Sequence, residues 1–149
     1  MDALIATLGW AGILAPVSLG AVGSIIGCAR AGQAAAGAML ETESGHGRYI
    51  GVSAMPSSQT IYGVVVMLTL SRPVDAANAP ALAGIGFVVS VALMLSAIYQ
   101  GYCCASAIQV SKSKPQIFGP SLAPAGIVEG FAVFAFVFAL LLAGQIPTA

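Results

Sequence analysis

Glu129 is the strongest candidate for chemistry, because it is the one charged residue in the apolar run from Pro115 to Ala149. A charged side chain at mid-membrane costs about 3 kcal/mol on insertion scales, so a residue of this kind is usually functional. We therefore expect a cation or a proton to accompany the carboxylate. The alternative without transport is a neutral carboxyl group that hydrogen-bonds between helices.

Two glutamines are expected at a similar membrane depth to Glu129. Gln59 follows a basic residue by 11 positions, Gln100 precedes one by 12, and Glu129 follows one by 15. At about 1.5 Å per helical residue these offsets correspond to roughly 16 to 23 Å. We therefore predict that the three long polar side chains approach one another. Alternatively, the glutamines are ordinary hydrogen-bond partners between helices.

The stretch from Met55 to Gly63 brings further oxygen atoms to this depth. Its proline lacks an N–H group and so leaves a helix carbonyl without its usual donor. Residues 55, 58, 59 and 62 are spaced by three, four and seven positions and share one helix face. Tyr62 on this face either donates its hydroxyl to the carboxylate or is a packing aromatic.

The oxygen-rich composition of these residues favours a metal cation over a proton. A hard cation such as sodium prefers several oxygen ligands. A carboxylate, two carboxamides, a hydroxyl and a carbonyl would supply them. A proton site needs only Glu129 and one hydrogen-bonding partner, which leaves the second amide unexplained.

The composition requires these side chains to be positioned by membrane helices. Of 149 residues, 58% are hydrophobic and 7% charged, against about a quarter charged in soluble domains. The balanced charges give no basic field to hold nucleic acid. Because a spanning helix needs about 20 apolar residues, the runs 3–29, 49–71, 76–111 and 115–149 predict an all-α membrane protein with four transmembrane helices.

The basic residues predict an orientation for these four spans. Four of the five Lys and Arg residues fall at the connections 30–48 and 112–114, which lie on the same side of the membrane. The positive-inside rule makes that side cytoplasmic. Both termini and the turn at 72–75 are then expected on the outer side. His46 is expected in a cytoplasmic turn and is assigned no role.

The chain resembles itself at an offset of 72 residues. The matches predict two tandem helical hairpins, residues 1–72 and residues 73–149, of which the second carries the acidic residue. Matched segments are Ala11-Gly12-Ile13 with Ala83-Gly84-Ile85, Val17-Ser18 with Val89-Ser90, Ser24 with Ser96, and Ile26 with Ile98.

Small residues recur at spacings of three and four in the first and third spans, as at Gly20, Gly23 and Gly27. Such faces allow close approach of helix backbones in lipid. The close packing is either inside a four-helix monomer or between copies in a ring. The three cysteines lack metal-ligand spacing and are interpreted as buried small side chains: Cys28, Cys103 and Cys104.

At these residues the sequence resembles the proteolipid rotor component, known as c or K, of V-type and archaeal-type rotary ATPases. The resemblance covers essentially the whole chain. It implies a sodium ion held by Glu129, Gln100, Gln59, the Ser58 hydroxyl and the main-chain carbonyl of Met55, with Tyr62 bonded to the glutamate. The motifs that carry it are Pro56-Ser57-Ser58-Gln59, Ile61-Tyr62-Gly63, Ile98-Tyr99-Gln100-Gly101 and Ile127-Val128-Glu129.

Two positions depart from the pattern of the sodium-translocating members. Ser58 stands where those members carry Thr, which preserves the oxygen atom. Gly130-Phe131 follows the glutamate where Thr-Tyr is common, which changes the local surroundings of the site.

The resemblance also implies the assembly in which the chain works. Identical copies form a ring in lipid, with the first and third helices inside and the second and fourth outside. The ring turns against a stator subunit that bears an arginine, and its cytoplasmic connections touch the central-stalk coupling subunit. The chain itself is then not an enzyme and needs no organic cofactor. H⁺ in place of Na⁺ is the nearest alternative, and a small four-helix drug/proton antiporter is an alternative from another class.

Overall fold

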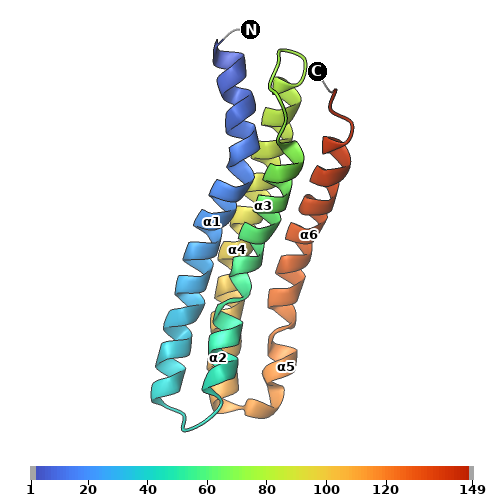
Figure 1. Cartoon of the computed structure of the whole chain (residues 1–149). Helices are drawn as coiled ribbons and strands as arrows, with labels where there is room; N and C mark the ends of the chain where they lie inside the picture. The colour runs from blue at the N-terminus through green and yellow to red at the C-terminus, as the bar shows by residue number, and fades with distance from the viewer. Residues whose placement is uncertain (1–2, 148–149) are drawn as a thin grey trace.

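The computed structural model describes residues 3–147, and this part of the chain is a bundle of four long helical rods (Figure 1). The first rod is α1 (Ala3–Leu40) and the third is α4 (Ala79–Ser113). The second rod consists of α2 (His46–Ser53), the 3-10 turn η1 (Met55–Ser57) and α3 (Ser58–Leu70). The fourth consists of η2 (Pro115–Ile117), α5 (Phe118–Ser121) and α6 (Ala123–Ala143).

Three segments are long and apolar enough to cross a membrane, namely Ala3–Leu40, Ala79–Ser113 and Pro115–Ala143, with mean hydropathies of 1.8, 2.4 and 2.4. The second rod is interrupted by η1, and for this reason neither of its helices reaches that length alone. From residue 46 to residue 70 it nevertheless extends about 37 Å at the helical rise. The predicted all-helical fold with four rods is confirmed.

The first connection is shorter than the sequence predicts. We expected the segment 30–48 to link the first two spans, but α1 continues through Arg30 to Leu40, and only residues 41–45 lie between the two helices. The reason is the alanine-rich segment after Arg30, since alanine has the highest helix propensity. Ala31, Ala35 and Ala38 are buried in the bundle, which stabilises this extension further.

Glycines bring α1 and α4 into backbone contact. A Cβ atom at Gly86 would collide with the carbonyl oxygen of Gly12, and a Cβ atom at Gly101 would collide with the backbone of Gly27. Small residues permit this close approach in lipid. The glycine face of α1 therefore serves packing inside one chain, which was one of the two alternatives left open by the sequence.

The same face of α1 also receives α3. A Cβ atom at Gly63 would collide with the carbonyl oxygen of Pro16. The Thr60 hydroxyl donates a hydrogen bond to the Ser24 hydroxyl at 2.8 Å. These contacts fix the height of α3 against α1, and with it the height of Gln59.

Arg72 and Arg48 join the rods at opposite ends of the bundle. Arg72 donates hydrogen bonds to the carbonyl oxygens of Ala143 at 3.1 Å and Ile146 at 3.2 Å, at the end of α6. At the other end, the Arg48 guanidinium lies 5.1 Å from the ring centroid of Tyr49 and 5.3 Å from that of Phe118. The second rod is thus tied to the fourth rod near both of its ends.

Candidate functional site

Glu129 is half-buried on α6 and accepts three hydrogen bonds from two other rods. Its Oε1 atom accepts from the Ser58 hydroxyl at 2.8 Å and from the Tyr62 hydroxyl at 3.1 Å. Its Oε2 atom accepts from Gln100 Nε2 at 3.0 Å. Three donors are the means by which a protein stabilises a carboxylate away from water, because hydrogen bonds to the charged form replace its hydration.

The two glutamines form a buried relay behind the carboxylate. Gln59 Nε2 donates to Gln100 Oε1 at 3.0 Å and to the Ser96 hydroxyl at 3.2 Å. Ser96 in turn donates to the carbonyl oxygen of Val128 at 2.9 Å. Both glutamine side chains are fully buried. The relay fixes the orientation of both amide groups and leaves the Gln59 Oε1 atom 3.2 Å from Ser58 Oγ.

Three oxygen atoms gather around the Ser58 hydroxyl. Ser58 Oγ lies 2.8 Å from Glu129 Oε1, 3.1 Å from the carbonyl oxygen of Met55 and 3.2 Å from Gln59 Oε1. A serine hydroxyl has one hydrogen to donate. With Glu129 ionised, at most one of these three contacts can therefore be a full hydrogen bond, and the lone pairs of the remaining oxygen atoms face one another. A hard cation is the ligand that such a set of oxygens accommodates.

The helix interruption before Ser58 places the Met55 carbonyl in this cluster. Pro56 cannot donate to the preceding helix turn, and the chain tightens into η1, in which the Ser57 N–H group donates to the Ala54 carbonyl at 3.0 Å. The Ser58 N–H group likewise donates to Met55. The break therefore positions a main-chain oxygen beside the Ser58 hydroxyl.

All six residues named from the sequence meet at this one place between the second rod, α4 and α6: Glu129, Gln100, Gln59, Ser58, Met55 and Tyr62. The expectation that the three long polar side chains approach one another is confirmed. Ser96 was not singled out as a site residue, although it lies four positions before Gln100 and so shares its helix face.

His46 and the cysteines lie outside this cluster. His46 Nε2 is 2.7 Å from the carbonyl oxygen of Thr42 at the far end of the bundle. Cys104 is buried and its sulfur lies 3.9 Å from the sulfur of Met55, whereas Cys28 and Cys103 are half-buried. In residues 3–147 no three His, Cys, Asp or Glu side chains are grouped to hold a metal ion. A cation here would rely on the mixed oxygen set around Ser58.

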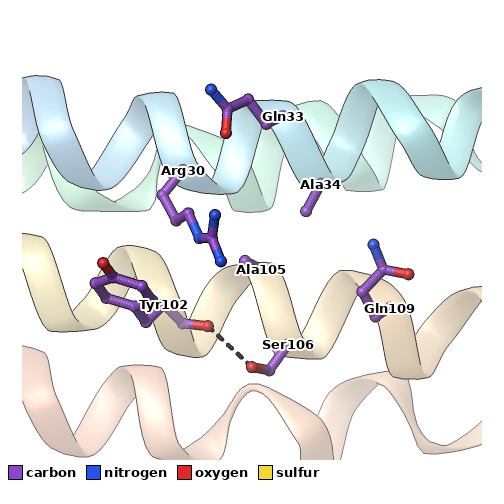
Figure 2. A pocket seen from close by; sticks show the side chains of 7 residues that line it. All are labelled: Arg30, Gln33, Ala34, Tyr102, Ala105, Ser106 and Gln109. Atoms are coloured by element: carbon purple, nitrogen blue, oxygen red, sulfur yellow. Dashed lines mark hydrogen bonds between the residues drawn. The ribbon is translucent and has the colours of Figure 1, made fainter.

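Away from this cluster, a polar hollow of about 370 Å³ lies between α1 and α4 (Figure 2). The Arg30 guanidinium points into it, 5.3 Å from the ring centroid of Tyr102. Gln33, Ser106 and Gln109 line the rest of the hollow, and no carboxylate is among its lining residues. With an arginine and no acidic group, it does not have the chemistry of a cation site.

The fold and the site define a class: a multi-pass membrane protein of duplicated helical hairpins with one half-buried carboxylate between helices. The family model for the C subunit of ATP synthase matches the chain twice, at residues 11–70 and 83–142, and the chain belongs to this family. The second match begins 72 residues after the first, which is the offset found in the sequence.

A second comparison concerns a single relative of the chain. The chain is 36% identical over 138 residues to the A-type ATP synthase subunit K of Methanocaldococcus jannaschii. The aligned region covers 89% of this chain and 62% of the relative. The chain therefore spans less than two thirds of the length of the relative that it matches.

Proposed function

We propose that the chain is the proteolipid rotor subunit of an A/V-type rotary ATP synthase or ATPase, and that it carries Na⁺ at Glu129. Membership of the ATP synthase C-subunit family supports the rotor role, and the similarity to an A-type subunit K supports the type of complex. ATP is hydrolysed or made in the soluble sector. The chain contributes the ion-carrying step alone.

The observation that carries the choice of Na⁺ is the oxygen cluster around Ser58. A sodium ion would be coordinated by Glu129, Ser58 and Gln59 side-chain oxygens and the Met55 carbonyl, with Gln100 as a further ligand or as the residue that orients Gln59. Tyr62 would remain bonded to the carboxylate. A proton is the second candidate, but a proton on Glu129 relieves only one of the close oxygen contacts of Ser58.

The transport step that we propose follows from the position of the Glu129 carboxylate, which lies between α6, the second rod and α4. Identical copies form a ring in lipid, in which each carboxylate is shielded until its copy reaches the stator subunit. An arginine of that stator competes for the carboxylate and releases the ion into an access channel. Each chain contributes two units, residues 1–72 and 73–149, and only the second bears the carboxylate.

The orientation proposed for the chain follows its basic residues. Arg48, Lys112 and Lys114 lie at one end of the bundle, where the Lys112 ammonium is 2.8 Å from Glu41. We place this end in the cytoplasm, in contact with the central-stalk coupling subunit, and both termini on the outer side. A four-helix drug/proton antiporter is disfavoured, because both halves of the duplicated hairpin match the rotor family.

Carbodiimide labelling of Glu129 in the assembled complex tests the site and the ion together. Labelling requires a protonated carboxyl, so we expect Na⁺ at moderate pH to protect Glu129, while K⁺ at equal ionic strength does not. Absence of Na⁺ protection, with labelling that depends on pH alone, would replace Na⁺ by H⁺. No labelling of Glu129 under any condition would contradict the site.

Adjacent serines offer a matched control for this assay. Ser58→Ala removes the hydroxyl at the centre of the cluster, and we expect it to raise the Na⁺ concentration needed for half-protection by about tenfold or more. Ser57→Ala removes a hydroxyl that donates to the Ala54 carbonyl at 2.7 Å, outside the cluster. It should leave the half-protecting concentration unchanged. Equal shifts in both variants would argue against coordination by Ser58.

A further inference from the structure

An apolar groove runs between α4 and α6 on the surface of the bundle. The part near the start of α4 is lined by Gly84, Val88 and Ala92 of α4 together with Phe138 of α6. The part near the middle of α4 is lined by Ala92, Leu95 and Tyr99 of α4 together with Phe131 of α6. Because the two parts share Ala92, they form one continuous surface, which we call the α4–α6 groove.

The internal repeat relates this exposed groove to the most buried face of α1. Five α1 residues of that face correspond, at the offset of 72, to residues that line the groove. The face of α1 receives both α4 and α3 inside the chain, whereas in the described structure the corresponding face of α4 receives only α6, which is the repeat counterpart of α3. The five pairs are Gly12 with Gly84, Pro16 with Val88, Gly20 with Ala92, Gly23 with Leu95, and Gly27 with Tyr99.

The reverse mapping identifies an exposed stripe on α1. Atoms of Leu82, Gly86, Met94, Ala97 and Gly101 on α4 surround the glycines of α1 inside the chain. Subtracting 72 from these positions gives five exposed residues, with Trp10 at 55% and Ile25 at 68%, whereas Ala83, which also meets Gly12, corresponds to the half-buried Ala11. We call this set the α1 stripe, and its members are Trp10, Leu14, Val22, Ile25 and Ala29.

We infer that the α1 stripe of one copy docks in the α4–α6 groove of the next copy, in the register of the α1–α4 contact inside each chain. This inference rests on the proposed function, since it specifies how identical rotor subunits meet. The occupant is a second copy for the following reason. The α4–α6 groove is the repeat counterpart of the glycine face of α1, and the α1 stripe is the counterpart of the α4 surface that contacts this face inside the chain. Two surfaces whose counterparts already bind each other are therefore expected to bind between copies. Both are apolar, so the contact between them would be held by van der Waals packing, which is one of the forces that join helices in lipid.

The contact between copies differs from the contact within a chain in its spacing. Inside the chain, glycines allow the α1 and α4 backbones to touch. Between copies, Tyr99 replaces Gly27 and Leu14 replaces Gly86 at the corresponding positions. The helix axes are therefore farther apart between copies than within one, with side chains filling the gap.

The next copy also closes the back of the ion site. Ser96, which holds Gln59 in place, lines the groove together with Tyr99 and Phe131. The docked α1 stripe covers this part of the groove. The neighbour thereby separates the Ser96 side of the relay from lipid and water.

Disulfide cross-linking in the assembled complex tests the register, in a background in which Cys28, Cys103 and Cys104 are replaced by alanine. The in-chain pairs Gly12–Gly86 and Gly27–Ala97 map to Leu14 with Gly84, and to Ile25 with Tyr99, of adjacent copies. A Cβ atom at Gly84 has no other atom within 4 Å in one chain. A disulfide from it to residue 14 is therefore expected only between chains, because the two Cβ atoms of a disulfide lie about 3.8 Å apart.

We expect Leu14→Cys/Gly84→Cys and Ile25→Cys/Tyr99→Cys to give ladders of dimers, trimers and larger species on oxidation. The matched controls exchange the partners: Leu14→Cys/Tyr99→Cys and Ile25→Cys/Gly84→Cys use the same four positions out of register and should remain monomeric. Ladders of equal strength from exchanged pairs would overturn the register. Native mass spectrometry of the reduced samples, which retains the ring, verifies assembly of each variant.

The outcomes separate this inference from the proposed function. Intact rings whose in-register pairs do not cross-link contradict the docking surface and leave the rotor role in place. Absence of rings from the unsubstituted chain contradicts both. If a double variant does not assemble, Ala92→Trp, which fills the groove, is compared with Ile61→Trp on the exposed face of α3. Rings lost only with Ala92→Trp support the inference, and rings retained with Ala92→Trp contradict it.

Discussion

The two halves of the chain share one architecture, but only the second half carries a carboxylate within the membrane. At the offset of 72 residues, Glu129 corresponds to Ser57. The partners of Glu129 do not have polar residues at the corresponding positions either, since Ser58 corresponds to Gly130 and Tyr62 to Phe134. Gln59 corresponds to Phe131 and Gln100 to Cys28. In this duplicated hairpin, the polar cluster around a carboxylate is thus present in one half and its counterpart is absent from the other.

Under the proposed function, this difference determines how much charge a ring of such subunits carries. One carboxylate serves four helices, so a ring of given circumference carries fewer ions per turn than a ring of single hairpins with a carboxylate each. Every elementary charge moved against 100 mV requires about 2.3 kcal/mol. With fewer charges per ATP, the assembly can pump against a steeper gradient. Under the proposed function, the asymmetry favours ATP-driven pumping.

The largest expected effect comes from removing the charge that distinguishes the halves. Glu129→Gln keeps the size of the side chain and can still accept from Ser58 and Tyr62, but it has no charge to hold a cation. We expect near-complete loss of coupled ion transport with the ring still assembled. Transport by the reconstituted complex, with native mass spectrometry as the assembly control, measures this. Normal pumping by the mutant ring would refute the role of Glu129.

The second prediction compares the contact within the chain with the contact between copies. Gly86→Leu drives a side chain into the backbone of α1 at Gly12, and we expect destabilisation of about 3 kcal/mol, the upper end for overpacking. Gly84→Leu meets open space within one chain, and Leu has a higher helix propensity than Gly.

Thermal unfolding in detergent measures the difference between these glycine variants. We expect a clear loss of Tm for Gly86→Leu in the monomeric chain. Gly84→Leu should retain the Tm of the monomer and lose stability only in the ring. Equal losses of monomer stability would show that the two glycines do not distinguish two kinds of contact.

The smallest expected effect concerns the tyrosine hydroxyl. Tyr62→Phe makes the second rod resemble its counterpart at Phe134 and removes one of three donors to Glu129. Loss of a hydrogen bond to a charged group is worth about 1.5 kcal/mol, or roughly tenfold in Na⁺ affinity. Phe134→Tyr adds a hydroxyl at the position without a carboxylate and should change nothing. The Na⁺ concentration for half-protection from carbodiimide measures both, and an unchanged value for Tyr62→Phe would identify Tyr62 as a packing residue.

Four helical rods and the meeting of six residues could be predicted from the sequence because both depend on simple periodicities. Uncharged runs mark the spans, and distance from basic residues marks the depth of Gln59, Gln100 and Glu129. The extension of α1 past Arg30 could not be predicted in this way, because a charge does not end a helix. An alanine-rich segment packed on α4 continues it.

The remaining features depend on contacts between distant parts of the chain. Ser96 becomes part of the site only because α4 and the second rod place it within reach of Gln59. Arg72 was placed in the outer turn by its charge, but its bonds to the end of α6 depend on where that helix stops. The sequence left open whether the α1 glycines pack within one chain or between copies. The close contact between the Gly12 carbonyl and Gly86 shows that they pack within one chain.

The length of α1 has a mechanical consequence. Its 38 residues extend about 57 Å, whereas the hydrocarbon layer is about 30 Å thick, and ordinary helix tilts below about 40° do not absorb the excess. The helix therefore projects from the bilayer, and its hydrogen-bonded backbone continues unbroken from the projecting end to the level of Glu129. Under the proposed function, torque applied at the projecting end of a ring would therefore reach the carboxylates through continuous helices, which twist less than flexible loops would.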